Sequence, residues 1–565
     1  MATFYQEKLD FTTTKEIEAA YEKLLQENIE SVRQLEDWLV RVSTLQEEVE
    51  EGISGHYIDF QCYSDSETAR KQYEFDNEYL EPLRKTYSAK LDEKFLENRF
   101  KKDLDIHWYA PLIKRKVNAQ DLYREENTRL EVEEDRLSTR YFEITGGLTA
   151  EWEGQTLSLS ELSPYMEHTD RSVREKAMRL SYEAFGEVKE ELQQILSDLI
   201  QLRKKKTENA GLSNYAEYMF KEYERFDYTP EDCRTLAASV REEVLPVLSE
   251  VQEKHKEKLG FQQYRPWDIQ APAPGEKPLK PFENRAELVS RASSIFEKLD
   301  PRFQELIETM DARGMLDLTA RKGKAPGGFC SNLPISNLSF IFMNASGVHD
   351  DMITLLHEMG HCIHNDFTSH FRLHEYKETP MEAAELASMS MELLTMDHWH
   401  HYYQDEKELN QAKRDQFTGV LSLLPIGVVV DQFQHWMYEN PDHSEEERLQ
   451  KFQSLHEKFG TGVVDWDGLE EWRSRSWLRI LHIFEVPFYF IDYVIAQIGA
   501  LQVYKNYKQN PDQALQQYKE ALKLGSSVPL PDVYKAAGIK FDFSKETLHE
   551  LMVFVQDELR QLEEA

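Results

Sequence analysis

The residues of this chain that are best suited to chemistry form the sequence His-Glu-Met-Gly-His, from His357 to His361. The flanking pattern is helical, so the two histidines are predicted to share one helical face, about one turn apart. Two imidazoles at this spacing can bind one divalent cation, most often zinc. Glu358 follows the first histidine directly, where its carboxylate can take a proton from an attacking water molecule. The sequence therefore predicts a metal centre with its own general base.

A catalytic zinc site also needs a third protein ligand and one open coordination position. Downstream of the motif, Thr379-Pro380-Met381-Glu382 has the pattern of a helix start with a capping box. The helix that follows places Glu385 one turn after Glu382, and Glu392 two turns later on the same face. Glu385 is predicted to be the third ligand. Glu382 is predicted either to cap the helix or to orient a ligand histidine. Glu392 is predicted at most to contact a ligand residue on the side that faces away from the metal.

These two motifs carry a resemblance. HEMGHCIH (His357 to His364), followed by ELASMSME (Glu385 to Glu392), resembles the thimet oligopeptidase and oligoendopeptidase F family of zinc peptidases. In that family, HExGH with a further histidine three residues later precedes a glutamate ligand on the next helix. The Pz-peptidase type fits best, through the segments Arg265 to Asp268 and His482 to Tyr489. The resemblance covers residues 170 to 565.

The resemblance implies a metalloendopeptidase that binds one Zn²⁺ per chain and cleaves internal bonds of short unfolded peptides. It also implies donors for the negative charge that develops on the substrate carbonyl oxygen. The residues that match the family's donors are His482, Tyr489 and Tyr493. The thimet branch has paired glycines before its tyrosines, where this chain has Val486 and Pro487, so the match of individual tyrosines stays open. Without the family, Tyr489 would be interpreted as a core aromatic residue.

A short β-region is predicted just before the metal helix. The stretch from Phe329 to Asn344 is rich in strand-forming residues, with at least one strand at Ser339 to Asn344. That strand is expected to offer an edge to which an extended substrate adds. The paired glycines upstream would let backbone approach a substrate closely, although a simple turn explains them equally well. The candidate substrate-binding residues are Gly327, Gly328, Ile341 and Met343.

The rest of the chain has mainly helical periodicity. A small hairpin is predicted near Thr145 to Leu159, and Ala271 to Pro281 is the strongest linker signal. The apolar run Gly419 to Val430 is too short to span a bilayer and is interpreted as a buried core helix. The predicted fold is mainly α, with a small β-sheet next to the zinc helix. Following the resemblance, two helical subdomains flank a deep substrate cleft, with residues 1–170 as an N-terminal helical region and 171–565 as the catalytic region.

The composition of the chain disfavours several kinds of partner and compartment. The chain has 103 acidic and 67 basic residues, a net charge of −36, which disfavours nucleic acid and membrane partners. Its four cysteines are far apart and form no CxxC pair, which indicates a reducing compartment and no cysteine zinc site. The N-terminus lacks the pattern of a signal peptide. We therefore expect a cytoplasmic protein with oligopeptide substrates, and its oligomeric state stays open.

Two alternatives stay open at this point. A helical zinc carboxypeptidase also combines HExxH with a later glutamate, and it would release single residues from the C-terminus of a peptide. An inactive peptide-binding homologue is the other, although the presence of Glu358 argues against it, because such a protein has no use for the base.

Overall fold

Helices make up most of the computed structural model, which describes residues 4–325 and 327–564. Before the first strand lie α1 (Lys15–Gln26), α2 (Val32–Cys62), α3 (Glu67–Phe75), α4 (Glu81–Glu97), α5 (Ile106–Leu122) and α6 (Glu125–Gly146). Between the two sheets lie α7 (Leu159–Leu162), α8 (Arg171–Glu187), α9 (Lys189–Ala210), α10 (Tyr215–Glu222), α11 (Pro230–Ser239), α12 (Leu245–Leu259), α13 (Arg285–Leu299) and α14 (Pro301–Ala312). After the second sheet come α15 (His349–Thr368), α16 (His374–Lys377), α17 (Met381–Thr395), α18 (Glu406–Glu439), α19 (Glu445–Lys458), α20 (Glu470–Arg475), α21 (Leu481–Phe484), α22 (Phe490–Gln509), α23 (Pro511–Leu522), α24 (Leu530–Ala536) and α25 (Lys545–Glu564).

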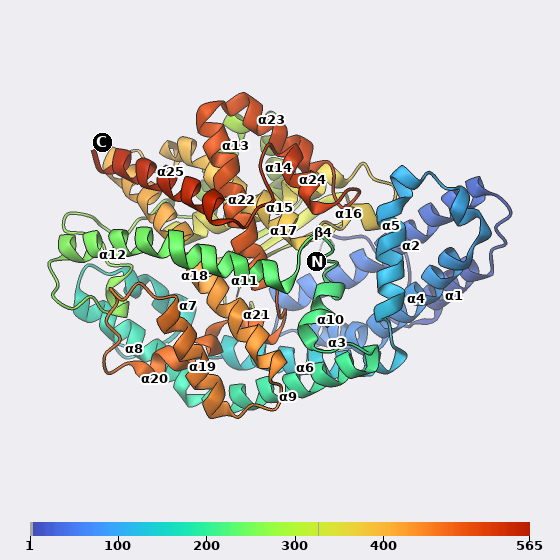
Figure 1. The fold of residues 1–565 in the computed structure, drawn as a ribbon, viewed down its shortest axis with the longest axis horizontal. Coiled ribbons are helices and arrows are strands. Elements are labelled where there is room, and N and C mark those ends of the chain that lie inside the picture. Colours follow the sequence, from blue (N-terminus) through green and yellow to red (C-terminus); the bar gives the residue numbers. More distant parts are fainter. Residues whose placement is uncertain (1–3, 326, 565) are drawn as a thin grey trace.

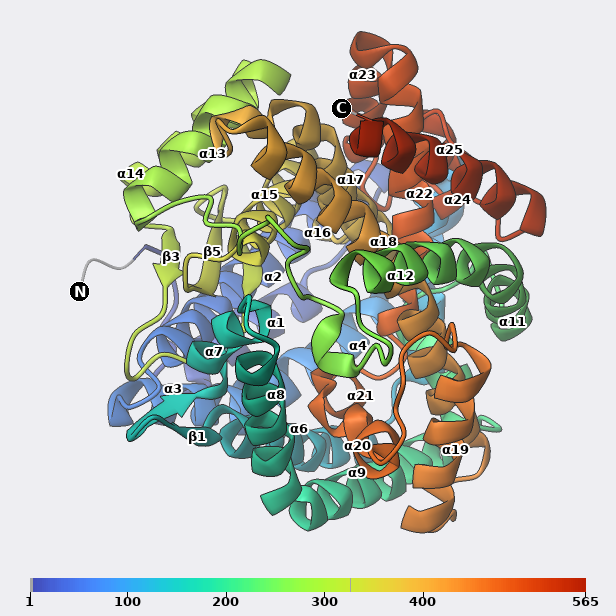
Figure 2. The same cartoon turned by 90° about the vertical axis from the view of Figure 1, so that its left-hand side faces the viewer.

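The helices form two groups, which Figures 1 and 2 show from perpendicular directions. One group contains α13, α14, α15, α17 and α23 to α25, and the other contains α6, α8, α9, α19 and α20. A cavity of about 550 Å³ is lined by Met178 of the second group and by His349 and Asp350 of the first, so it lies between the two groups. The predicted fold, mainly helical with two helical parts on either side of a cavity, is confirmed.

The predicted hairpin is confirmed by strands β1 (Thr149–Trp152) and β2 (Gln155–Ser158), which pair antiparallel. Its two turn residues, Glu153 and Gly154, both have positive φ angles of 51° and 84°. A two-residue turn of this kind matches the right-handed twist of the strands, and glycine adopts the positive φ without a steric cost.

The second sheet has three strands, in the order β3-β5-β4: β3 (Leu316–Thr319), β5 (Leu338–Ala345) and β4 (Phe329–Leu333). Strand β5 pairs in parallel with β3 and antiparallel with β4, so it is the central strand. The prediction that Ser339 to Asn344 offers an edge is therefore wrong. The reason is β3, a four-residue strand that short-range patterns do not reveal. Strand β4 lies at an edge of the sheet.

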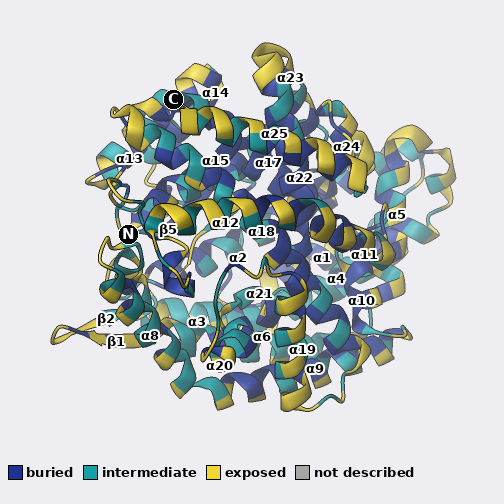
Figure 3. Cartoon of the chain, turned by 60° about the vertical axis from the view of Figure 1, so that its left-hand side comes forward, coloured by how far each residue is buried: buried dark blue, intermediate teal, exposed yellow. Residues whose placement is uncertain are grey.

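Helix α17 forms the centre of the core. Every residue from Glu385 to Thr395 is buried, and the helix packs between α15 and α22, as its dark colour in Figure 3 shows. A helix that is buried on all sides is enclosed by other elements. The ligand candidate on this helix is thus carried by one of the most enclosed elements of the molecule.

A second apolar core belongs mainly to the N-terminal helices. It contains residues of α1, α2, α4 and α5, together with Phe371, Leu373 and Tyr376 from the segment after α15. Other early residues, such as Leu122 and Tyr141, belong to the main core. The division into residues 1–170 and 171–565 stays a prediction, since apolar packing crosses it in both directions.

Helix α18 has the length and composition of a membrane-crossing helix. However, 67% of its most apolar 18-residue window is buried inside the protein, as in a core helix. The helix continues through Pro425, which is itself buried. The interpretation of Gly419 to Val430 as part of a buried core helix is confirmed.

The predicted linker, Ala271 to Pro281, is a loop fixed to its neighbours. His255 Nε2 donates to the Ala271 carbonyl at 2.8 Å, and Gln411 Nε2 donates to the Lys277 carbonyl at 3.1 Å. The loop lines the cavity between the two groups of helices. Its proline and glycine content therefore reflects an irregular wall of the cavity and not a hinge between domains.

Candidate metal centre and active site

Helix α15 begins at His349 with a cap supplied by an acidic side chain. One carboxylate oxygen of Asp351 accepts hydrogen bonds from the backbone amides of Ser346, Gly347 and Val348, at 2.8, 2.7 and 2.9 Å. These contacts satisfy amides that a helix start leaves without partners. The capped helix then continues without a break through the motif from His357 to His361.

The structure brings the three candidate ligands together from two helices. His357 and His361 lie on α15, and Glu385 lies on α17. Nε2 of His357 is 3.3 Å from Glu385 Oε2, and Nε2 of His361 is 3.8 Å from Glu385 Oε1. The possible ligand atoms of all three residues lie within 4.8 Å of one another. Two imidazole nitrogens and a carboxylate at this separation are a donor set that zinc binds, with a coordination position left for substrate or water.

The glycine inside the motif lets the two helices meet. A Cβ atom on Gly360 would lie only 2.5 Å from the Cα atom of Ser388 on α17. Such a contact is too short for two carbon atoms that are not bonded to one another, so a larger residue would push α17 away. Gly360 therefore allows α17 to place Glu385 beside the two histidines.

A second carboxylate orients one of the imidazoles. Glu392 Oε1 lies 2.7 Å from Nδ1 of His357, and its other oxygen accepts from Gln416 Nε2 at 2.8 Å. Because Nδ1 of His357 is engaged, Nε2 is the atom that faces the centre of the site. This arrangement fits a metal ligand. Gln416 was not singled out from the sequence, since nothing local relates it to Glu392 on another helix.

Glu382 has a different environment from the predicted ones. Helix α17 begins at Met381 with Pro380 as its N-cap and no side-chain cap, so the predicted capping box is wrong. Glu382 is buried, accepts a hydrogen bond from the Tyr228 hydroxyl at 2.6 Å, and lies 3.6 Å from Nε of Arg225. A buried carboxylate needs such partners, and they draw it away from the helix start and from the ligand histidines.

Burial and neighbouring charges oppose one another in setting the pKa values at the site. Burial raises the pKa of Glu358 to about 7, against the opposing charge of His357. It also lowers the pKa of His361 to about 4, whereas the contacts of His357 with Glu385 and Glu392 outweigh burial and raise the pKa of His357 well above its ordinary value. Burial alone would raise the pKa of Glu385, but the charges of His361 and His357 lower it to about 2. The site thus combines an ionised ligand carboxylate with a second carboxyl group that can exchange a proton near neutral pH.

The three candidate donors for the substrate oxygen also lie at this site. His482 comes from α21, and its Nε2 shares a hydrogen bond of 3.1 Å with the Tyr493 hydroxyl. Burial lowers the pKa of His482 to about 4. The Tyr489 hydroxyl donates to Oε1 of the candidate ligand Glu385. Tyr489 is therefore directed at the metal centre, and the interpretation of this residue as a core aromatic is wrong.

The candidate substrate-binding residues have two different environments. Gly327 has a φ of +97°, which requires glycine, and a Cβ on Gly328 would lie 3.6 Å from Thr354 Cγ2, three residues before His357. These glycines thus lie beside the metal helix. Ile341 and Met343, in contrast, lie on the central strand β5 and are buried. They cannot present a strand edge to a substrate.

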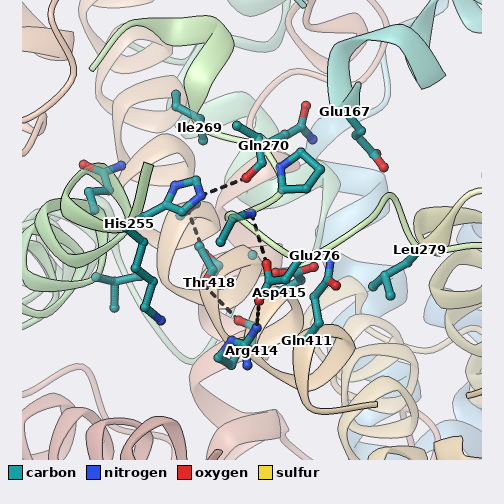
Figure 4. Close-up of a pocket in the computed structure, with 18 of the residues that line it drawn as sticks. Glu167, His255, Ile269, Gln270, Glu276, Leu279, Gln411, Arg414, Asp415 and Thr418 are labelled. Carbon is teal, nitrogen blue, oxygen red and sulfur yellow. Dashed lines mark hydrogen bonds and ion pairs between the residues drawn. The ribbon is translucent and has the colours of Figure 1, made fainter. Parts of the chain in front are cut away.

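The cavity between the helix groups adjoins the site (Figure 4). Figure 4 shows Glu167, Glu276 and Asp415 directed into it, with Arg414 and His255 at its wall. Its lining also includes Asp350, two turns before His357, and Gln416, the partner of Glu392. None of the three candidate ligands lines it. The cavity is therefore a neighbouring space that reaches the back of the site.

Comparisons with known proteins agree with this geometry. The family model described as peptidase family M3 matches residues 164–553. The oligopeptidase PepF of Bacillus subtilis (strain 168) is 23% identical over 71% of this chain and 58% of its own length. The chromosomal oligoendopeptidase F of Lactococcus lactis subsp. cremoris is 25% identical over 60% of this chain and 55% of its own length. The matched region thus spans little more than half of these curated relatives.

The fold extends the likeness over the whole chain. A solved structure of Pz peptidase A with an inhibitor superposes with a TM-score of 0.93, at 24% identity, over 99% of both chains. The fold is thus shared from end to end, and the resemblance seen in the sequence is confirmed. Because the family model covers well over half of the 565 residues, the chain belongs to peptidase family M3.

Proposed function

We propose that this chain is a zinc-dependent oligopeptidase that hydrolyses internal bonds of short, unfolded peptides in the cytoplasm. The observation that carries the proposal is the meeting of His357, His361 and Glu385 within 4.8 Å, beside Glu358, in a member of peptidase family M3. One Zn²⁺ per chain would bind there. The four cysteines, all free, suit a reducing compartment.

Each of the site residues has a separate role in the proposed hydrolysis. The two histidines and Glu385 would hold the zinc ion, and a zinc ion bound there would polarise the scissile carbonyl and make water a stronger nucleophile. Glu358 takes a proton from the attacking water and passes it to the leaving amine. Glu392 keeps His357 in the orientation that binding requires.

The donors opposite the metal stabilise the negative charge on the carbonyl oxygen. Tyr493 and His482 share a hydrogen bond in this structure, and we assign both as donors to the oxygen of a substrate. Tyr489 acts from a different position, because its hydroxyl donates to Glu385. We assign it to the same catalytic group, with the added role of fixing the carboxylate ligand.

The substrate is expected to bind along β4. This strand lies at an edge of the sheet, it packs against α15, and the Gly327-Gly328 pair precedes it. An extended peptide can add to such an edge through backbone hydrogen bonds, which a folded protein cannot offer. The net charge of −36 makes nucleic acid and membranes poor partners. Short unfolded peptides are the class of substrate that fits.

Mass spectrometry of the products from a mixed peptide library tests this function. We expect paired fragments from internal cleavage, with folded proteins left intact. Stepwise loss of single C-terminal residues would instead identify the helical carboxypeptidase, and binding of the peptides without products from the zinc-loaded protein would identify an inactive homologue.

A further inference from the structure

The segment that carries the proposed donors is short and irregular. It contains α21 and the turn Glu485 to Tyr489 that leads into α22. Within the turn, Phe488 has a φ of +65°, a conformation that residues with a side chain rarely adopt. A bulky residue remains in such a conformation only where its surroundings determine it. The contacts of this segment therefore decide where His482, Tyr489 and Tyr493 lie.

A buried arginine from α9 binds the first half of the segment. Arg203 donates to the carbonyl of Ile483 at 3.2 Å and to the carbonyl of Phe484, and its side chain is fully buried. Its charge is balanced by Glu134, whose Oε1 accepts from Nε at 2.6 Å. These two carbonyls directly follow His482 in the chain.

A second buried arginine, from the segment between α10 and α11, binds the other half. Arg225 donates to the carbonyl of Phe488 at 2.7 Å and to both carboxylate oxygens of Asp492, at 2.7 and 2.8 Å. Both side chains of this ion pair are fully buried. Asp492 directly precedes Tyr493, and Phe488 directly precedes Tyr489.

The amide of the strained residue is held as well. Gln434 of α18 accepts the backbone amide of Phe488 through Oε1, at 2.9 Å. The Phe488 ring is completely buried. Both polar backbone groups of Phe488 thus have side-chain partners from other parts of the chain, and these partners explain how the positive φ is maintained.

We propose that Arg203 and Arg225 are positioning residues that hold the segment from His482 to Tyr493 in a single conformation, so that its donors are in place before a substrate binds. The inference rests on the proposed function of these donors. Donors fixed in advance need no rearrangement during the reaction, and a displacement of about 1 Å can cost about 10²-fold in rate. Without a glycine hinge, this chain depends on the two arginines to place the segment.

The test compares Arg203→Lys and Arg225→Lys with Arg174→Lys. Arg174 is a suitable control because it is also buried and also donates to backbone carbonyls and one buried carboxylate, those of Trp267, His168 and Asp268. Lysine keeps the charge in each case but lacks the longer, rigid guanidinium group whose nitrogens make these contacts. We expect the first two variants to lower kcat about 10- to 100-fold, with KM and zinc content near the parent values. Arg174→Lys should leave kcat unchanged.

Amide hydrogen exchange of the fragment from Ile480 to Tyr493 gives the second measurement. Exchange in this fragment should become at least about tenfold faster in Arg203→Lys and Arg225→Lys, and stay at the parent rate in Arg174→Lys. If a lysine variant fails to fold, Gln434→Met, which removes only the acceptor for the Phe488 amide, should give a smaller change in the same direction.

Parent-like kcat and parent-like exchange in the folded Arg203 and Arg225 variants would overturn the proposal. An equal loss of kcat in Arg174→Lys would overturn it too, because the effect would then be a general loss of stability. The exchange measurement needs no substrate. If the parent protein cleaves no peptide, the proposed function fails, while the exchange rates still decide whether the arginines hold the segment.

Discussion

At the scale of single residues, two buried glutamates of α17, Glu382 and Glu392, differ in their partners. Nδ1 of His357 contacts the carboxylate of Glu392 at 2.7 Å, whereas Glu382, two turns and more away on the same helix, contacts Tyr228 and Arg225 instead. A carboxylate behind a ligand histidine fixes the ring and makes its other nitrogen a better donor. The two glutamates are therefore a matched pair for testing this role.

We predict that Glu392→Ala weakens zinc binding about 10- to 100-fold. Glu382→Ala removes a carboxylate from the same helix without touching a ligand, so it should lower thermal stability and leave zinc affinity near the parent value. Zinc dissociation constants measured by competition with a chelator check both. Equal affinities in the two variants would show that Glu392 does not support His357.

Substitutions of Tyr493 and Tyr489 should likewise differ in their effects on kcat and zinc binding. Tyr493→Phe removes a donor needed only as charge develops on the substrate, so kcat should fall about 10²–10³-fold, or about 2.7–4 kcal/mol, with little change in KM. Tyr489→Phe should also weaken zinc binding, because its hydroxyl donates to Glu385. Steady-state kinetics and zinc content check the pair. Parent-like kcat in Tyr493→Phe would transfer the main donor role to Tyr489.

Much of the site could be predicted at this scale, and the limit is physical. The spacing of His357, Glu358 and His361 on one helix follows from helical periodicity alone. The partners of Glu382 could not be predicted, because Tyr228 and Arg225 lie more than 150 residues earlier and reach it only through tertiary packing. Patterns within one helix cannot distinguish a glutamate that faces a ligand from one that faces a buried arginine.

At the scale of elements, the close approach of α15 and α17 is the critical packing contact. It depends on the missing side chain of Gly360, as the 2.5 Å separation from Ser388 Cα shows. Two other features of packing escaped prediction. The strand β3 is only four residues long, and its parallel pairing with β5 joins segments separated by a turn-rich stretch. Parallel pairs leave no hairpin signal in the sequence, and the predicted strand edge was wrong for that reason.

We predict that Gly360→Ala destabilises the protein by about 1–3 kcal/mol and weakens zinc binding, because α17 must move away. Gly186→Ala is the control, since Gly186 lies in helix α8 and, among the described residues, no packing partner comes within 4 Å of the added Cβ. That change should leave stability unchanged or raise it by about 0.5–1 kcal/mol. Urea unfolding of both variants measures this. Equal stabilities would mean that the two helices can separate without cost.

A buried histidine on α16 should make stability depend on pH. Burial would lower the pKa of His374, but the charges of Glu378 and Glu50 outweigh it and raise the pKa to about 9. Nε2 of His374 lies 3.2 Å from Glu378 and 3.3 Å from Glu50. The unfolded chain has the ordinary value near 6.5. The stabilisation is therefore complete below about pH 6.5 and is lost as the pH rises through 9.

We expect deprotonation of His374 to lower the free energy of unfolding by about 1–3 kcal/mol between pH 6.5 and 9.5. This energy range allows for solvent screening, because Glu378 is half exposed. The same titration of His374→Gln isolates the contribution, since all other groups are shared. The variant should show a flatter decline over this range. Parallel curves for parent and variant would contradict the assignment.

At the scale of the whole molecule, the two groups of helices enclose a cavity that adjoins the candidate metal site. Sequence periodicity predicts the helices, and the family resemblance predicts their arrangement, which the TM-score of 0.93 to Pz peptidase A confirms. The contacts that join distant segments, such as Arg203 to the Phe484 carbonyl across 281 positions, depend on that arrangement and leave no trace in local patterns. The family motif therefore predicts the metal-binding and catalytic residues, and the fold indicates which distant contacts position them.

In the proposed mechanism, two histidines and Glu385 bind a catalytic zinc while Glu358 serves as the base. The most direct test measures zinc content and cleavage of a short quenched peptide for the parent, Glu358→Gln and Glu385→Ala. The parent should bind one zinc per chain and cleave the peptide internally. Glu358→Gln should keep its zinc but lose about 10²–10⁴-fold in kcat, because an amide cannot accept the proton of water, and Glu385→Ala should lose both zinc and activity. Parent-like turnover in Glu358→Gln, or full zinc occupancy in Glu385→Ala, would contradict this mechanism.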